Sequence, residues 1–125
     1  MKRIIKTDKA PAPVGPYSQA VEVNGTLYLA GQVAIDPASG EVVDGGIQEQ
    51  TEQVMKNIGA VLSEAGYSFK DVVKCTCLLD DLGDFQAMNE IYGKYFTEDP
   101  PVRTAFGSND LPLGVKIEIE TIAAK

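Results

Sequence analysis

Three charged residues near the C-terminus have the types and spacing to act on a small anionic substrate. Arg103 opens one apolar segment, and Glu118 and Glu120 lie two residues apart in a later one. A guanidinium group binds a carboxylate through two parallel hydrogen bonds, and a glutamate can position or deprotonate water. The plainer alternatives are an Arg–Glu bridge between neighbouring strands and two glutamates on the solvent side of an amphipathic strand. Spacing alone leaves these alternatives open.

Two glycine-containing segments are further candidates. Tyr17 follows Gly15-Pro16, so its ring could cover a sheet edge or its hydroxyl could donate to a ligand. Gly31 and Gln32 follow a segment of strand-forming residues. They form either a simple turn or a place where the backbone approaches a substrate closely.

Several kinds of chemistry are excluded by composition. The chain has no histidine, which removes Ser-His and Cys-His nucleophiles, histidine metal ligands and imidazole acid–base catalysis. Cys75 and Cys77 cannot complete a four-ligand zinc site by themselves. Their spacing places both on one face of a strand, where they are badly oriented to bond each other. We therefore expect no metal and two reduced thiols in the core, which suits the cytosol.

The charge of the chain restricts its partners. The formal net charge is −7, and Arg3 and Arg103 are its only arginines, whereas nucleic-acid binding needs a basic surface. No apolar run approaches the roughly 20 residues that span a bilayer, and the N-terminus lacks the apolar region of a signal peptide. The sequence therefore predicts a cytoplasmic protein that binds neither nucleic acid nor membrane.

The elements that must position these residues follow from periodicity and turn signals. In the first half we expect a proline-rich loop at 10–17, a hairpin around Asn24-Gly25 and a turn at 36–40. Helical spacing of apolar residues predicts a helix over 47–65 that ends at Gly66. The strands expected here are 2–6, 18–23 and 26–30.

The second half begins with a capped turn at 68–71 and a strand at 72–79. A second helix is expected over 84–96, with Phe85, Met88 and Tyr92 on one side. Strands at 102–107 and 115–123 follow, the latter alternating strictly between apolar and charged residues. Residues 1–125 are thus predicted to form a single α+β domain, in which a mixed sheet carries two helices on one face.

The sequence closely resembles the Rid family of reactive imine and enamine deaminases, also called the YjgF superfamily, along essentially its whole length. The matching segments share position and residue type with the family pattern. They are Ala10-Pro11-Ala12, Gly15–Ala20, Gly31-Gln32, Asp36-Pro37, Gly40, Val72-Val73-Lys74, Asp84-Phe85, Asn89–Tyr92, Pro101-Val102-Arg103, Leu111-Pro112 and Lys116–Glu120. An arginine followed at this interval by a Glu-Ile-Glu strand is the family's signature.

The resemblance implies a chorismate-mutase-like fold and a homotrimer with three clefts between subunits. It also implies a hydrolase that needs no cofactor: a 2-iminobutanoate/2-iminopropanoate deaminase, which converts 2-aminoacrylate and its imine tautomer to a 2-keto acid and ammonia. Arg103 would bind the substrate carboxylate, Glu118 would activate water, and Tyr17 would lend its hydroxyl. Backbone groups of Gly31 and Ala105 would contact the imine end.

The family pattern also places Asn89 near the cleft, as a substrate-binding residue. Two positions depart from that pattern: many members carry Cys where this chain has Ala105, and Ser where it has Ala30. These departures keep open the alternative of a trimer that binds or senses small 2-keto acids without turnover. An RNA-directed activity, a chorismate mutase and a purely structural trimer are weaker alternatives, because the chain is acidic and poor in arginine.

Overall fold

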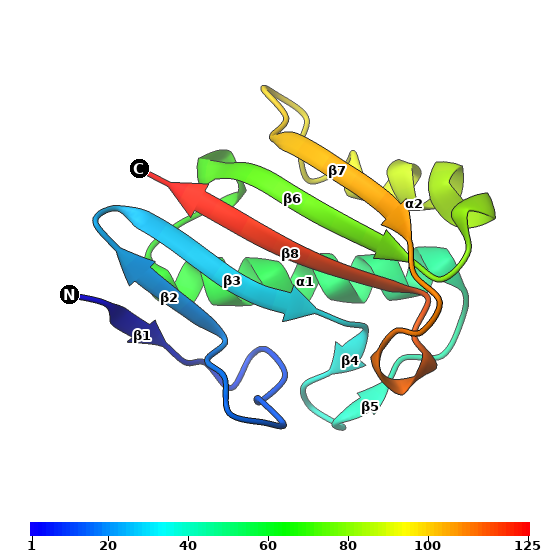
Figure 1. The fold of residues 1–125 in the computed structure, drawn as a ribbon, viewed down its shortest axis with the longest axis horizontal. Helices are drawn as coiled ribbons and strands as arrows, with labels where there is room; N and C mark the ends of the chain where they lie inside the picture. Colours follow the sequence, from blue (N-terminus) through cyan, green and yellow to red (C-terminus); the bar gives the residue numbers. More distant parts are fainter.

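A six-stranded mixed sheet organises the molecule, and the computed structural model describes all of residues 1–125. The spatial order is β1-β2-β3-β8-β6-β7, and a separate two-stranded hairpin contains β4 and β5. The strands are β1 (Arg3–Ile5), β2 (Ala20–Val23), β3 (Thr26–Gln32), β4 (Ile35–Asp36), β5 (Glu41–Val42), β6 (Val72–Leu79), β7 (Val102–Gly107) and β8 (Ile117–Ala124). Within the large sheet only β6 and β7 run parallel (Figure 1).

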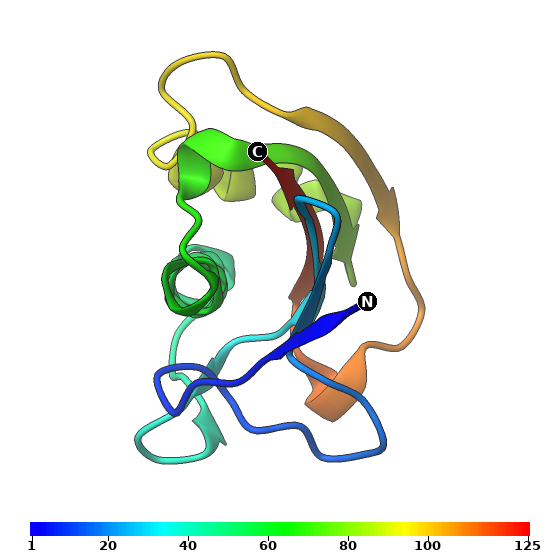
Figure 2. The ribbon, with the colours of Figure 1, turned by 90° about the vertical axis from the view of Figure 1, so that its left-hand side faces the viewer.

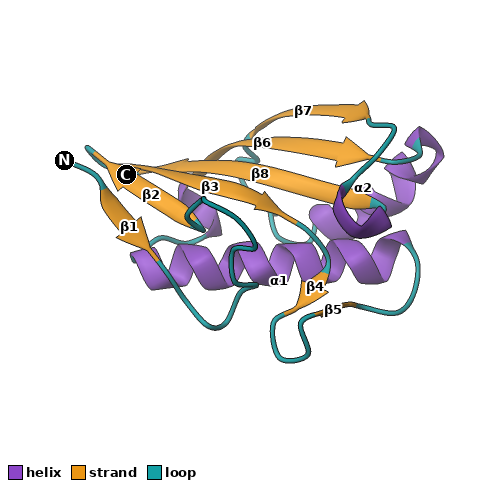
Figure 3. Cartoon of the chain, turned by 60° about the horizontal axis from the view of Figure 1, so that its bottom comes forward, coloured by secondary structure: helices purple, strands orange, loops and turns teal.

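Two helices lie on one face of this sheet, which curves around them (Figures 2 and 3). They are α1 (Ile47–Ala65) and α2 (Phe85–Tyr92), and α1 packs against β3, β8 and α2. Short 3₁₀ turns occupy Phe69–Asp71, Leu82–Asp84 and Pro112–Gly114. The α+β arrangement predicted from the sequence is confirmed. None of the helices is long and apolar enough to cross a membrane.

Helix α1 has the predicted boundaries because local signals fix both ends. At its start, the backbone N–H of Gly46 donates to Oε1 of Glu49 at 2.8 Å, which anchors the first turn. At its end, Gly66 adopts the left-handed region with φ of 84°, a conformation that favours glycine. Its inward stripe, including Val54 and Ile58, is fully buried in the core.

The second helix is shorter than the sequence predicts, because it ends at Tyr92 rather than Phe96. The N–H groups of Lys94 and Tyr95 bond to carbonyls three residues back, so the α-helical pattern tightens into turns. Tyr95 and Phe96 still pack against the core and against Phe69, in tilted and edge-to-face contacts with ring centroids 5.1 and 5.6 Å away. Aromatic packing therefore fixes this segment without helical geometry.

The central strands separate apolar from polar side chains as their alternation predicts. Ile117 and Ile119 of β8 are buried beneath the helices, although the strand begins at Ile117 rather than at Val115. Cys75 and Cys77 of β6 share that face as buried, free thiols. The even-numbered residues of β8 point to the opposite face, which carries no helix (Figure 2).

We call this helix-free side of the sheet the open face. It presents Tyr28 of β3, Glu118 and Glu120 of β8, and Val102 and Phe106 of β7. Its apolar members are substantially exposed, and Val102 retains 67% of its accessible surface. Exposed apolar groups on a sheet are typical of an interaction surface.

Candidate functional site

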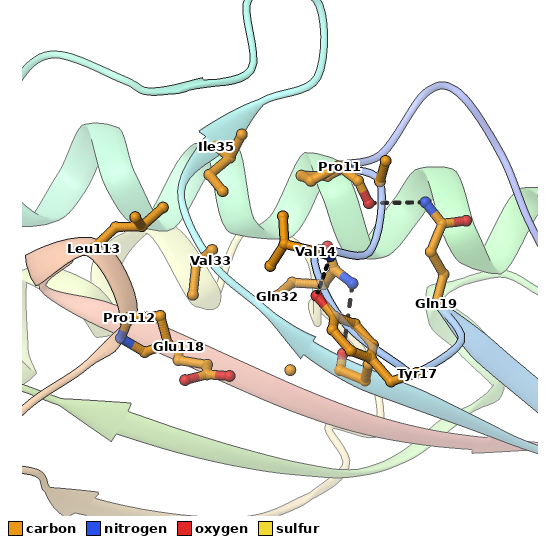
Figure 4. A pocket seen from close by; sticks show the side chains of 13 residues that line it. Pro11, Val14, Tyr17, Gln19, Gln32, Val33, Ile35, Pro112, Leu113 and Glu118 are labelled. Carbon is orange, nitrogen blue, oxygen red and sulfur yellow. Dashed lines mark hydrogen bonds between the residues drawn. The ribbon is translucent and has the colours of Figure 1, made fainter.

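A pocket of about 570 Å³ opens where the proline-rich loop, the end of β3 and the turn Pro112–Gly114 meet β8 (Figure 4). We call it the Glu118 pocket. Its thirteen lining residues are Pro11, Ala12, Val14, Tyr17, Gln19, Ala30, Gly31, Gln32, Val33, Ile35, Pro112, Leu113 and Glu118. Glu118 is their only acidic member, and none is a lysine or arginine.

Gly31 creates the space that the Glu118 carboxylate occupies. A Cβ built on Gly31 would lie 3.0 Å from Cδ of Glu118 and closer still to Oε2, and real Cβ atoms are not found that close to a neighbour. The pairing of β3 with β8 is also irregular between Leu29 and Gln32, as expected where a glycine permits a bulge. Gly31 and Gln32 lie within strand β3 and do not form a simple turn. The backbone of Gly31 approaches the Glu118 side chain closely, and its approach to a substrate stays a prediction.

The carboxyl group of Glu118 is harder to ionise than an ordinary glutamate. Its half-buried position raises its pKa above the usual 4.5, and the neighbouring charge of Glu120 raises the pKa further. Burial penalises the charged form, and a like charge does the same. A carboxyl group of this kind can take up and return protons nearer to neutral pH than a solvated one.

Tyr17 lies on the opposite side of the pocket from Pro112 and Leu113 (Figure 4). Its side chain is half-exposed, and its hydroxyl accepts a long hydrogen bond of 3.5 Å from the backbone N–H of Val14. The hydroxyl proton is thus free to be donated into the pocket. The sequence left Tyr17 as either an aromatic cover or a donor, and its placement is compatible with both.

Gln19 holds the proline-rich loop in place at the pocket wall. Its buried side-chain amide accepts a hydrogen bond from the backbone N–H of Thr7 at 2.7 Å. It also donates to the carbonyls of Thr7, at 3.0 Å, and Pro11, at 2.9 Å. A loop with few backbone donors of its own needs such a side chain to satisfy its polar groups.

Arg103 lies outside this pocket, on the edge strand β7, among uncharged partners. Its Nη1 donates to Oδ1 of Asn89 at 2.7 Å. Its Cζ is 5.1 Å from the ring centroid of Phe85 and 4.9 Å from that of Tyr92. The three partners occupy positions i, i+4 and i+7 of α2 and so share one side of that helix. We call Arg103, Phe85, Asn89 and Tyr92 the Arg103 cluster.

The Arg–Glu bridge that the sequence left open does not form at Arg103. The chain's one salt bridge joins Nε of Arg3 to Oε1 of Glu22 at 2.9 Å, elsewhere in the sheet. Arg103 therefore keeps a positive charge that no carboxylate of its own chain neutralises. Such a group is available to an anionic ligand.

Within one chain, Arg103 and Glu118 project from opposite faces of the sheet. Arg103 is in register with Cys75, and Cys75 with Thr121, so all three face the helices. Glu118 lies three residues before Thr121 on β8 and therefore points to the open face. Ala105 lies two residues beyond Arg103, on the same side as Arg103, and packs against the core.

The predicted site residues thus form two groups. The structure brings Tyr17, Gly31 and Glu118 together in the Glu118 pocket. It places Asn89 and Arg103 in contact with each other, but away from that pocket. No three His, Cys, Asp or Glu side chains lie close enough together to hold a metal ion.

Sequence reasoning missed the apolar walls of the pocket and the aromatic partners of Arg103. Val14, Ile35 and Leu113 are far apart in the chain, and no periodicity joins them. Phe85 and Tyr92 carried a usable signal, since with Asn89 they form one stripe of the second helix. The sequence prediction places Phe85 and Tyr92 on one side of the helix but gives them no partner.

Comparison with known proteins places this geometry in a family. The sequence model described as Endoribonuclease L-PSP matches residues 7–125. A RutC family protein of Pyrococcus horikoshii is 52% identical over 125 residues, covering 100% of this chain and 99% of its own. The human 2-iminobutanoate/2-iminopropanoate deaminase is 49% identical over 123 residues, covering 98% of this chain and 90% of its own.

Solved structures agree with the sequence matches. RidA from the Antarctic bacterium Psychrobacter sp. PAMC 21119 superposes with a TM-score of 0.95 at 45% identity, covering 98% of this chain and 99% of its own. E. coli TdcF with bound serine gives a TM-score of 0.94 at 35% identity, covering 98% of both chains. Sequence model, relatives and structures therefore identify the chain as a member of the Rid family, whose sequence model is described as Endoribonuclease L-PSP.

Proposed function

We propose that this protein is a 2-iminobutanoate/2-iminopropanoate deaminase, which hydrolyses reactive 2-imino acids to 2-keto acids and ammonia. The observation that carries the proposal is the Glu118 carboxylate, held over Gly31 in an apolar pocket with a raised pKa. Relatives about 49% identical over the full chain carry this activity in their names. The two free, buried thiols support a cytoplasmic location.

The complete site requires two copies of the chain, because neither group of residues is sufficient alone. The Glu118 pocket has no cation to bind a carboxylate, and the Arg103 cluster has no acid to activate water. The Glu118 carboxylate is on the open face, and Arg103 is on the edge strand β7, whose exposed apolar residues on the open face are Val102 and Phe106. We propose a chorismate-mutase-like homotrimer in which Arg103 of one copy faces Glu118 of the next.

The reaction needs little machinery, because an imine carbon is already electrophilic. Arg103 and the backbone around Ala105 hold the carboxylate and the imine end, while Glu118 holds a water molecule against C2. Glu118 takes a proton from that water as the water oxygen bonds to C2, and passes this proton to the imine nitrogen, which gives a carbinolamine. Glu118 then transfers the hydroxyl proton of the carbinolamine to the same nitrogen as the C2–O double bond forms and the C2–N bond breaks. Ammonia leaves, and the keto acid remains. Each tenfold gain in rate requires about 1.4 kcal/mol, which proximity and one base can supply several times over.

A small molecule fits this site better than RNA does, although the matching sequence model is described as an endoribonuclease. The chain has a net charge of −7 and no histidine. Phosphate backbones bind through clusters of basic residues, and the pocket is lined without lysine or arginine. A largely apolar pocket with one acidic group, facing a single arginine of another copy, is suited to a small substrate that carries one carboxylate.

The test produces the imine substrate enzymatically in the same solution as the protein. A pyridoxal-phosphate-dependent threonine dehydratase produces 2-iminobutanoate in situ, and release of 2-oxobutanoate is followed with wild type, Arg103→Ala or Glu118→Gln. Acceleration by wild type alone is the expected result. Acceleration that survives in both variants would exclude these residues from the mechanism.

The sensor alternative has its own outcome in the same experiment. This chain has Ala105 where the family pattern often has a cysteine, so no thiol can act from this position. If wild type gave no acceleration but bound 2-oxobutanoate, the protein would be a keto-acid-binding trimer. Light scattering on the same samples tests the trimer itself, and a monomer would contradict the two-copy site.

A further inference from the structure

The two arginines of the chain are held in opposite ways. Arg3 is neutralised by Glu22 through a salt bridge of 2.9 Å. Arg103 is held by an amide oxygen and two aromatic rings, and no carboxylate of the chain contacts it. A carboxylate in that position would compete with a bound substrate for the same N–H groups.

We infer that Phe85 and Tyr92 are positioning residues of the substrate site. With Asn89, they fix the orientation of the Arg103 guanidinium group so that its remaining N–H groups bind the substrate carboxylate. This inference rests on the proposed function and adds to it two residues that never touch the substrate. It also assigns Asn89 a task different from the substrate contact expected from the sequence, because its Oδ1 is engaged by Arg103.

The aromatic pair is suited to this task because it orders a flexible cation without neutralising it. An arginine side chain loses considerable rotamer freedom when it is fixed, and its charge is attracted to the face of an aromatic ring. The ring centroids of Phe85 and Tyr92 lie 5.1 and 4.9 Å from Cζ. Arg103 is on an edge strand, where one neighbouring strand is missing, so α2 supplies the contacts that hold it.

Tyr92 is itself fixed by the core. Its side chain is buried, and its ring packs on Phe96 with centroids 4.8 Å apart. The cation therefore rests on a ring that the core holds in place.

The central experiment compares two identical substitutions, Phe85→Leu and Phe69→Leu. Both phenylalanines are half-buried and packed against the core, but only Phe85 contacts Arg103. For 2-iminobutanoate we expect Phe85→Leu to raise KM about fivefold with kcat within about twofold of wild type, as the loss of one cation–π contact predicts. Phe69→Leu lowers thermal stability to a similar extent but leaves KM near the wild-type value.

Tyr92 provides a rescue series. Tyr92→Leu removes the ring and should raise KM about fivefold or more, whereas Tyr92→Phe keeps the ring and should restore most of the affinity. Equal KM values for these two variants would overturn the role of the ring. Because Tyr92 is buried, the folding of both Tyr92 variants is first checked by circular dichroism. If either variant fails to fold, the KM of Phe85→Leu decides the result.

Asn89→Asp tests the requirement for neutral partners. The new carboxylate has the size of the amide but pairs with Arg103 and competes with the substrate, so KM should rise more than tenfold. Binding of 2-oxobutanoate should weaken in parallel. Binding of the uncharged 2-oxobutanamide, which gains nothing from the cation, should not change with this substitution or with Phe85→Leu.

Arg103→Ala separates this inference from the proposed function. Loss of 2-oxobutanoate binding in Arg103→Ala together with wild-type KM in Phe85→Leu and Asn89→Asp would overturn the positioning role alone. Undiminished turnover in Arg103→Ala would instead overturn the carboxylate-binding role of Arg103 in the proposed function. A rise of KM in all these variants, with 2-oxobutanamide binding constant, supports both.

Discussion

The Glu118 pocket and the Arg103 cluster place opposite charges in opposite kinds of structure. The pocket is built largely from irregular segments, a proline-rich loop and a 3₁₀ turn, around one half-buried carboxyl group. The cluster is built from a strand and a helix, and surrounds a guanidinium group with neutral partners. Burial shifts the acid toward its protonated form, whereas the cation is kept charged and unpaired.

This difference underlies the proposal that one chain is not a complete site. The sheet separates the two groups, since Arg103 faces the helices and Glu118 faces the open side. An acid and a cation in direct contact would neutralise each other and leave neither for a ligand. The sheet keeps Arg103 and Glu118 of one chain apart. In the proposed assembly, the substrate lies between Arg103 of one copy and Glu118 of the next, so the two charges do not pair directly.

The largest effect is expected when the two groups are inactivated in different copies. Arg103→Ala and Glu118→Gln should each lose activity by about a hundredfold or more. When the two inactive variants are unfolded together and reassembled, about a quarter of the sites in a randomly mixed assembly contain both native residues. Activity should therefore recover to about that fraction of the wild-type value.

The control is each variant unfolded and reassembled alone, which should stay inactive. If the mixture also stayed inactive while light scattering showed mixed assemblies, Arg103 and Glu118 of different copies would not share a site. The Glu118 pocket and the Arg103 cluster would then be two independent features of the molecule.

A smaller effect is expected from Gly31→Ala, which disturbs the pocket alone. The new Cβ would meet Cδ of Glu118 at 3.0 Å, so the carboxylate must move. The backbone at Gly31 does not require a positive φ, so the fold should survive. We expect kcat to fall about tenfold or more, as for a displaced catalytic group, with 2-oxobutanoate binding through Arg103 nearly unchanged.

Gly15→Ala is the matched control for that variant, because its Cβ would meet only the Tyr17 ring, at an ordinary 3.8 Å. Its kcat should stay near the wild-type value. Equal losses in the two variants would mean that any added methyl group near the pocket disturbs it, and that Glu118 has no special dependence on Gly31.

The sequence alone could single out Glu118 and Arg103 as a candidate acid and cation, but not their separation. Alternation along β8 placed Glu118 away from Ile117 and Ile119, and periodicity gave α1 its correct ends. The face that Arg103 occupies depends on the parallel pairing of β6 with β7. Parallel pairing joins strands across a helical connection, so no local pattern reports its register.

The two regions also differ in how much of their support was visible in the sequence. The partners of Arg103 stand on one helical stripe, which spacing alone can reveal. The support of the pocket is the side chain of Gln19, which satisfies backbone groups as far back as Thr7. Tertiary hydrogen bonds of that kind follow from how an irregular loop closes, and residue types in a proline-rich segment do not encode a period.

An intermediate effect on stability should follow from Gln19→Ala, which removes the support of the pocket loop. The substitution leaves the Thr7 N–H and the Pro11 carbonyl without their present partner. We expect a loss of about 2 kcal/mol in the free energy of unfolding, measured by urea titration. Gln48→Ala, which removes one exposed hydrogen bond to Glu90, should cost less than about 0.5 kcal/mol. Hydrogen exchange should rise in the loop of the Gln19 variant but not in α2, and a rise in both would mean that the two regions are not independently supported.

The smallest effect, and the most specific to the acid, is on pH dependence. The pKa of Glu118 is raised by burial first and by Glu120 second, and the base acts in its deprotonated form. Activity should therefore fall as pH drops through this raised pKa, at a higher pH than for an ordinary glutamate. Glu120→Gln removes the second cause but not the first, so the acid limb of kcat/KM should move to lower pH by only part of the shift.

The raised pKa of Glu118 also predicts how the stability of the fold depends on pH. The folded protein disfavours the ionised form of Glu118. At a pH above the raised pKa of the folded state, ionised Glu118 therefore lowers the free energy of unfolding, and below the ordinary pKa of 4.5 it has no such effect. Glu118→Gln should thus unfold at a higher temperature than wild type at neutral pH, and the difference should vanish in acid. A variant less stable than wild type at neutral pH would mean that the carboxylate stabilises the fold, and the contrast with the freely charged Arg103 would no longer hold.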